Sequence, residues 1–88
     1  MTRMNRHIAP PQEASRENED GTSENGELFY VVEVVSSGRL RATYEYNIYH
    51  WLESDSWEAD VISPHGWHDL DEDEVARIID AFHIKEGS

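Results

Sequence analysis

Two neighbouring segments of the chain, residues 28–35 and 40–52, alternate between two sets of side chains with a period of two, which is typical of β-strands. Most of these side chains are β-branched or aromatic, and such residues favour a pleated sheet over a helix. The apolar side chains that share one side are Leu28, Tyr30, Val32, Val34, Leu40, Ala42, Tyr44, Tyr46, Ile48 and Leu52. The pattern predicts a β-hairpin that buries this side.

The segment between the two strands, Ser36-Ser37-Gly38, predicts a three-residue turn, because glycine readily adopts the left-handed conformation that the last position needs. This turn places Val34 opposite Leu40. A two-residue turn at Ser37-Gly38 would mix the apolar and polar sides, so we favour the longer turn. The competing interpretation is a helix over residues 44–53, which has helical apolar spacing but consists of mediocre helix formers and has no N-cap.

Two further elements follow the hairpin. Residues 57–63 alternate again after the turn-forming segment 53–56, which predicts a third antiparallel strand beside the second one. Asp71 and Glu74 have the spacing of a capping box at a helix start. An apolar stripe at helical spacing accompanies them, and it consists of Val75, Ile78, Ile79 and Phe82. We expect a helix from about Glu72 to Ile84, with Gly87 just beyond its end.

These elements predict an α+β fold, namely a three-stranded antiparallel β-meander packed on one C-terminal α-helix (βββα). Residues 28–88 would form this single domain. Residues 1–27 lack periodicity and are rich in Glu, Asn, Ser, Pro and Arg. Such a segment buries too little apolar surface to offset its ordering entropy, so we expect a disordered acidic tail.

The charge of the chain changes the range of partners to consider. Its 88 residues include 19 acidic and 7 basic side chains, which gives a net charge of -12. Direct binding to nucleic acid or to an acidic membrane surface is disfavoured, because both need basic side chains. A basic protein partner is favoured by complementary potentials. The chain has no cysteine and no apolar run long enough for a membrane span, so we expect a cytoplasmic protein without disulfides.

Catalytic motifs are missing from the sequence. It contains no phosphate-binding glycine loop, no G-x-S-x-G and no H-E-x-x-H, so we expect neither an enzyme nor a bound cofactor. His65 and His68, with Asp69 or Asp71, have ligand types that suit zinc or nickel. The spacing matches no recognised zinc motif, and we therefore assign no metal ligands.

Two groups of residues are candidates for partner binding. One helix covers only one face of a sheet, so the other face should expose apolar residues among charged ones, as protein-binding surfaces do. The residues expected on this aromatic sheet face are Phe29, Val31, Val35, Tyr49 and Trp51. The residues expected to form an acidic surface are Glu58, Asp60, Asp69, Asp71, Glu72, Asp73 and Glu74.

Size, charge and the missing catalytic motifs together favour one function. We expect a small acidic protein-binding module that inhibits or modulates a basic partner, for example a nucleic-acid-processing enzyme, as phage or mobile-element inhibitors do. In such a protein the carboxylates imitate the phosphate row of a nucleic acid. The alternative is a homo-oligomeric structural or regulatory domain that associates through the outer sheet face.

Overall fold

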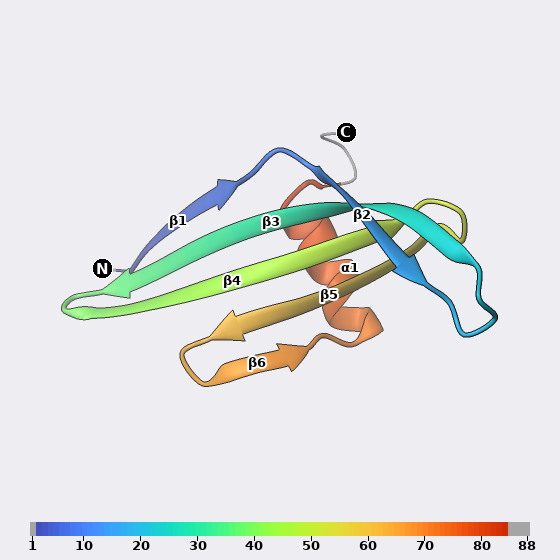
Figure 1. The fold of residues 1–88 in the computed structure, drawn as a ribbon. Helices are drawn as coiled ribbons and strands as arrows, with labels where there is room; N and C mark the ends of the chain where they lie inside the picture. Colours follow the sequence, from blue (N-terminus) through green and yellow to red (C-terminus); the bar gives the residue numbers. More distant parts are fainter. Residues whose placement is uncertain (1, 85–88) are drawn as a thin grey trace.

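The two longest strands of the protein form a central hairpin, to which every other strand is added. The computed structural model describes residues 2–84 (Figure 1). These residues form six strands and one helix: β1 (Thr2–Ile8), β2 (Gln12–Glu17), β3 (Ser23–Ser37), β4 (Leu40–Trp51), β5 (Ser56–Ser63), β6 (Gly66–Asp69) and α1 (Glu72–Ala81). The strands make one antiparallel sheet in the order β1-β3-β4-β5-β6, and β2 also pairs with β3. The α+β class and the antiparallel sheet are therefore confirmed.

The expected three-stranded meander with a disordered N-terminal tail is wrong. Residues 2–17 form β1 and β2, which pair with successive parts of the same edge of β3. Between them, residues 9–11 lie opposite only residues 29 and 30, so the edge carries one extra residue at Pro10-Pro11. Prolines have no backbone N–H to donate and are tolerated at such an edge.

The sequence pattern missed these strands because their side chains are mostly exposed, so no apolar alternation marks them. Backbone hydrogen bonds to β3 hold them instead. The turn between β2 and β3 does carry a local signal, since Asp20-Gly21 is a common turn pair. Gly21 has a φ of +85°, and its N–H donates to the carbonyl of Asn18 over 3.1 Å.

The register predicted for the central hairpin is also wrong. The turn consists of two residues, Gly38 and Arg39, and Ser37 lies opposite Leu40. Gly38 has a φ of +61° and stands first in the turn, where a type II′ turn requires glycine. Val31, rather than Val32, shares a face with Tyr46. This change turns every side chain of β3 to the side opposite to the predicted one.

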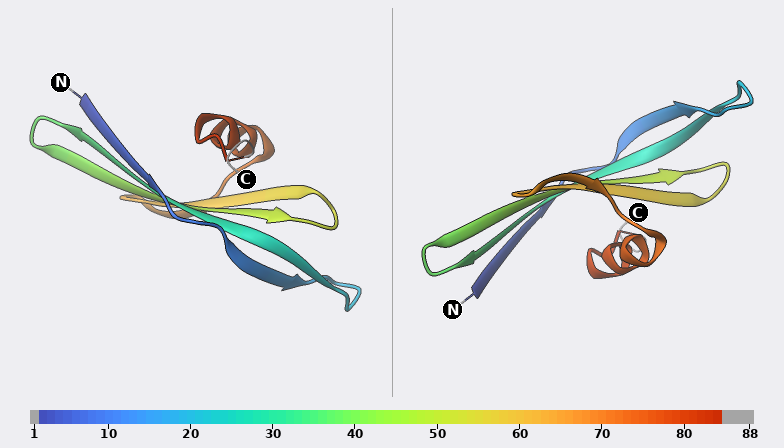
Figure 2. Two further views of the ribbon diagram at one scale, coloured as in Figure 1. Left: turned by 90° about the horizontal axis from the view of Figure 1, so that it is seen from above. Right: turned by 90° about the horizontal axis from the view of Figure 1, so that it is seen from below.

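The core lies between α1 and one face of the sheet, and Figure 2 shows the helix on that face alone. Val31 and Ile48 are fully buried there. The other members of this core are Phe29, Ala59, Val75, Phe82 and Ile84, with Tyr46, Trp57, Leu70, Ile78 and Ile79 packed against them. The apolar face predicted for β4 and β5 and the stripe predicted for α1 are thus on the buried side, except that Leu40 at the start of β4 and Leu52 after its end are exposed. The predicted core residues of β3 are not: Leu28, Tyr30, Val32 and Val34 lie on the other face.

The helix begins as its capping box predicts. The Asp71 carboxylate accepts from the Glu74 N–H over 2.9 Å, and the Glu74 carboxylate accepts from the Asp71 N–H over 3.3 Å. The helix ends at Ala81, before the expected end at Ile84, and Ile84 still packs into the core after a turn. Gly87 lies outside the described residues.

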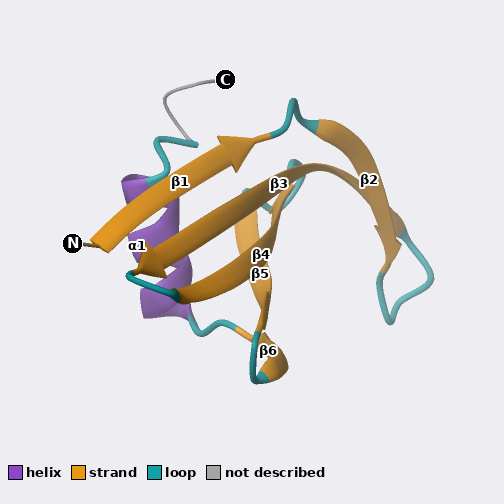
Figure 3. Ribbon diagram, turned by 90° about the vertical axis from the view of Figure 1, so that its left-hand side faces the viewer, coloured by secondary structure: helices purple, strands orange, loops and turns teal. Residues whose placement is uncertain are grey.

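An arginine of the first strand ties the edge of the sheet to the end of the helix. Arg6 donates to the Glu33 carboxylate from two nitrogens, over 3.1 and 2.9 Å. Its guanidinium also lies 4.3 Å from the centre of the Phe82 ring. Seen from the side in Figure 3, β1 runs beside α1, while β2 and the adjoining part of β3 curve away from it. The sheet therefore extends well beyond the area that the helix covers.

Candidate functional site

The sheet face opposite α1 is here called the outer face. Arg16 of β2 reaches across one end of it to Glu58 of β5, and no other element of the described chain covers the rest (Figure 2). Side chains that lie opposite each other in neighbouring strands share a face, so the strand register identifies its members. Its large apolar residues are Leu28, Tyr30, Val32, Val34, Tyr49, Trp51, Ile62 and Trp67. Trp51 is buried and the other five on β3 and β4 are half-buried, whereas Ile62 is 42% and Trp67 60% exposed. Exposed apolar side chains among polar and charged ones are typical of interaction surfaces in soluble proteins.

An acidic row lies beside these apolar residues, on β4, β5 and β6. Asp60 is directly opposite Asp69, and Asn47 donates to the Asp60 carboxylate over 3.0 Å. Glu45 lies on the same face of β4, two residues before Asn47, and accepts a hydrogen bond from the Tyr30 hydroxyl. Within residues 2–84, neither Asp60 nor Asp69 forms an ion pair. Two like charges directly opposite each other destabilise a sheet.

The outer face is basic at its other end. Arg3 on β1 and Arg41 on β4 both lie opposite Ser36, one on each side of β3. Both side chains are exposed, and neither forms an ion pair with the described residues. The face is thus basic at the β3–β4 turn, and the acidic row flanks its apolar middle on β4, β5 and β6.

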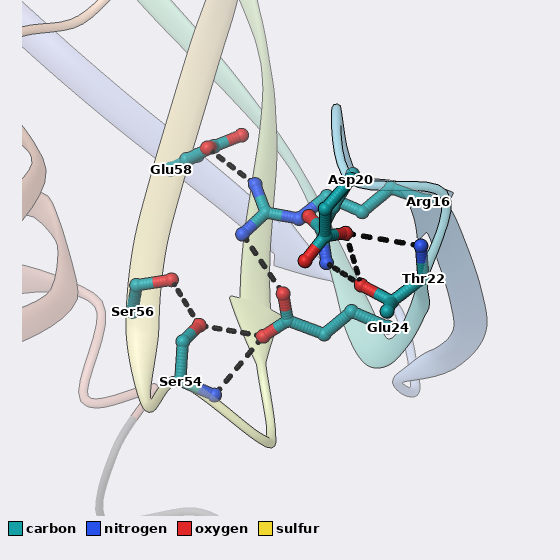
Figure 4. Close-up of polar contacts among 8 residues, drawn as sticks. Arg16, Asp20, Thr22, Glu24, Ser54, Ser56 and Glu58 are labelled. Atoms are coloured by element: carbon teal, nitrogen blue, oxygen red, sulfur yellow. Dashed lines mark hydrogen bonds and ion pairs between the residues drawn. The ribbon is translucent and has the colours of Figure 1, made fainter.

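A cluster of hydrogen bonds and ion pairs closes the far end of the outer face (Figure 4). The Arg16 guanidinium lies between two carboxylates, 3.1 Å from Glu24 and 2.7 Å from Glu58. Glu24 is only 4% exposed and also accepts from the Ser54 N–H over 3.0 Å and from the Ser54 hydroxyl over 2.5 Å. The cluster therefore joins the β2–β3 hairpin to the β4–β5 turn.

The same cluster determines how Glu24 titrates. The Ser54 hydroxyl, and after it the Ser54 N–H and Arg16, lower the pKa of the Glu24 carboxyl, against the opposing effect of its partial burial. Arg16 is also 4.4 Å from the centre of the Trp51 ring, which covers much of that indole. Since all its partners lie within the chain, we interpret this cluster as structural rather than as a binding site.

The aromatic residues predicted for partner binding do not form one surface. Phe29 and Val31 are buried in the core beneath α1, and Val35 lies on the same side of the sheet. Tyr49 and Trp51 do lie on the outer face, stacked with ring centres 5.5 Å apart. Trp51 is only 4% exposed.

The predicted acidic residues are divided between the two sides of the sheet. Glu58, Asp60 and Asp69 lie on the outer face. Asp71 and the first turn of α1, residues 72–74, belong to the helix on the other side (Figure 2). Only the first group adjoins the exposed apolar residues.

Sequence reasoning missed the residues that make up most of the outer face. Tyr30 and Val32 were expected on the buried side, and Trp67 was part of no predicted strand, whereas the structure has β6 there. The position of Gly38 could have prevented the first error. A two-residue turn that starts at this glycine turns the side chains of β3 to the opposite face from the one predicted with a three-residue turn. Ser63 opposite Gly66, with Pro64-His65 as the turn, was the signal for β6.

The described residues offer little for other kinds of site. No three histidine, aspartate or glutamate side chains within residues 2–84 lie close enough to share a metal ion. His50 Nε2 lies 2.7 Å from the Asp55 carboxylate, and the His50 ring stacks on Trp57 with centres 4.0 Å apart. No helix in this part of the chain is long and apolar enough to cross a membrane.

Comparison with known proteins identifies no relative of this chain. No protein-family model, curated protein or solved structure matches the chain. Function must therefore be argued from the outer face itself.

Proposed function

We propose that this chain is a small acidic protein-binding module whose outer face docks a basic partner and thereby inhibits or modulates it. The observation that carries the proposal is the pair Asp60 and Asp69, two carboxylates that lie directly opposite each other beside the apolar strip and form no ion pair with residues 2–84. A lysine or arginine from a partner would relieve this repulsion. The repulsion lowers the stability of the free protein, and docking of a basic partner would remove this loss.

The two parts of the face would contribute differently to binding. The apolar strip, with Tyr30 and Val32 at its centre, supplies most of the affinity, because burial of apolar area favours association. The acidic row selects basic partners and speeds their approach, in a protein whose net charge is -12. A nucleic-acid-processing enzyme is one class of partner with a suitable basic groove. On this proposal the protein acts by occupying that groove, and we expect it to have no catalytic activity of its own.

The second candidate function is self-association through the same face, as a homo-oligomeric structural or regulatory domain. One observation favours it: Arg3 and Arg41 lie at one end of the face and the acidic row lies beside its middle. A second copy that packs antiparallel and offset on this face would bring the arginines of each copy towards the acidic row of the other. Sedimentation velocity over a hundredfold concentration range separates the two functions, because only self-association depends on the concentration of this chain alone.

The test of the proposed function compares two charge reversals of equal size. Immobilised full-length protein captures partners from a lysate of the source cells, and each captured basic protein is purified and titrated by calorimetry. We expect the double variant Asp60→Lys/Asp69→Lys to weaken binding at least tenfold. The matched control, Asp73→Lys/Asp80→Lys on the exposed side of α1, should bind as the unmodified protein does.

Salt provides a second criterion. Affinity should fall as ionic strength rises, because exposed charges attract less strongly in salt. Equal loss in both double variants would show that net charge alone matters and would refute docking on the outer face. Binding that is indifferent to salt would refute the electrostatic part of the proposal.

A further inference from the structure

A groove on the opposite side of the sheet has a different chemistry. It lies between α1 and the ends of β4, β5 and β6, and its volume is about 310 Å³. This volume is at the lower end of the range for small-molecule sites. His65, His68 and Arg77 line it from three successive elements of the chain. We call it the helix-side groove.

The arginine in this groove has no partner among residues 2–84. Asp73, Glu74 and Asp80 lie three or four positions from Arg77 on α1, where ion pairs usually form. Arg77 nevertheless forms no ion pair or hydrogen bond within the described chain. The Glu74 carboxylate accepts from the Asp71 N–H instead. The donors of Arg77 are therefore available, in contrast to those of Arg6 and Arg16, which are held by carboxylates.

The remaining walls of the groove are largely apolar, and the Glu74 carboxylate and the hydroxyl groups of Ser63 and Tyr44 are the polar groups among them. Val61 is buried at its floor, and Ile78 and Leu70 line its sides. The ring of Tyr46 packs edge-on against Phe82 with centres 5.2 Å apart, so this wall is held in place. Burial and the nearby Glu33 charge raise the pKa of Tyr46, which keeps its hydroxyl protonated and able to donate.

We propose that the helix-side groove binds a small organic anion, whose carboxylate or phosphate group is held by Arg77, His65 and His68 and whose apolar body lies against Tyr46 and Val61. A guanidinium can donate two parallel hydrogen bonds to such a group, which suits planar carboxylates and phosphates. The net charge of -12 repels anions at long range. Binding therefore requires both the local cation and the apolar contact, and a bare inorganic anion should bind poorly.

The experiment is a titration of the full, isotope-labelled chain followed by NMR. Phenylphosphate and benzoate are the test ligands, and inorganic phosphate and phenol each lack one half of the proposed ligand. We expect phenylphosphate, benzoate or both to cause saturable shifts of the Arg77 side-chain N–H and of the His65 and His68 ring signals. Inorganic phosphate and phenol should each bind at least tenfold more weakly than the better test ligand.

The matched variants are Arg77→Gln and Arg3→Gln, which each remove one exposed arginine. Arg77→Gln should weaken binding at least tenfold, while Arg3→Gln on β1 should leave it unchanged. Equal effects of the two variants, or no saturable shift with either test ligand, would overturn the proposal. Inorganic phosphate that binds as tightly as phenylphosphate would also overturn it, since the apolar walls would then have no role. The variant Asp60→Lys/Asp69→Lys should still bind the ligand, so this result is independent of the outer face.

Discussion

Two adjacent valines of β3 provide a direct test of which face of the sheet is buried. Val31 is fully buried beneath α1, whereas Val32 is half-buried on the outer face. Replacing either one with alanine removes the same two methyl groups from the same strand. The pair is therefore its own control for strand propensity and for effects on the unfolded chain.

The expected magnitudes differ by severalfold. Burial of a CH₂ or CH₃ group contributes about 0.8 kcal/mol, so Val31→Ala loses about 1.6 kcal/mol of transfer free energy, and a residual cavity raises this to about 2 kcal/mol. For a domain of this size, that loss lowers the melting temperature by roughly 10 °C. Val32→Ala leaves a gap that water can enter, and we expect a loss of about 0.5 kcal/mol or less.

The measurement is equilibrium unfolding in urea, followed by far-ultraviolet circular dichroism at low micromolar concentration. Low concentration limits any contribution from association through the outer face. The slope with denaturant should be the same for both variants, so that the shift in midpoint reports stability alone. Equal losses, or a larger loss for Val32→Ala, would refute the register in which β3 turns Val31 towards the helix.

Three further outcomes follow from particular contacts. Gly26→Ala should destabilise the fold by about 1–3 kcal/mol in urea unfolding, because its Cβ would lie 2.6 Å from a backbone carbonyl oxygen of β4, and a neutral result would contradict this close approach. Glu24→Gln should flatten the acid limb of the stability curve. The Ser54 hydroxyl lowers the folded-state pKa of Glu24 below the ordinary 4.5, so its contribution is complete above pH 4.5 and is lost as the pH falls through the lower value. An unchanged acid limb would show that this carboxylate is not bound as described. Asp69→Asn should raise the melting temperature slightly in calorimetry, since relief of the repulsion from Asp60 is worth about 0.2–1 kcal/mol, and a lower melting temperature would argue against an unfavourable pair.

The helix is the element that local sequence predicted best. Asp71 and Glu74 form their capping box within four residues of chain, and the apolar stripe of α1 follows from a period that needs no distant partner. The apolar side of β4 was also predicted correctly, because the charged and polar residues of that strand separate cleanly from its apolar ones. The sequence also placed Glu58, Asp60 and Asp69 on an acidic surface, although it did not predict β6.

Other features depended on contacts between distant segments. β1 and β2 are exposed strands without an apolar pattern, and they exist because the free edge of β3 offers them backbone hydrogen bonds. Prediction of the candidate site depended less on β1 and β2 than on the orientation of β3. That strand carries apolar side chains on both of its sides.

Local sequence thus determined that β4, β5 and much of β3 are extended, where the helix starts and how much negative charge the protein carries. Only the tertiary structure decided which side of β3 faces the helix and which side remains for a partner. The physical reason is that a strand with Phe29 and Val31 on one side and Tyr30 and Val32 on the other can bury either. The two-residue turn at Gly38 and the single helix, which covers one face only, make that choice.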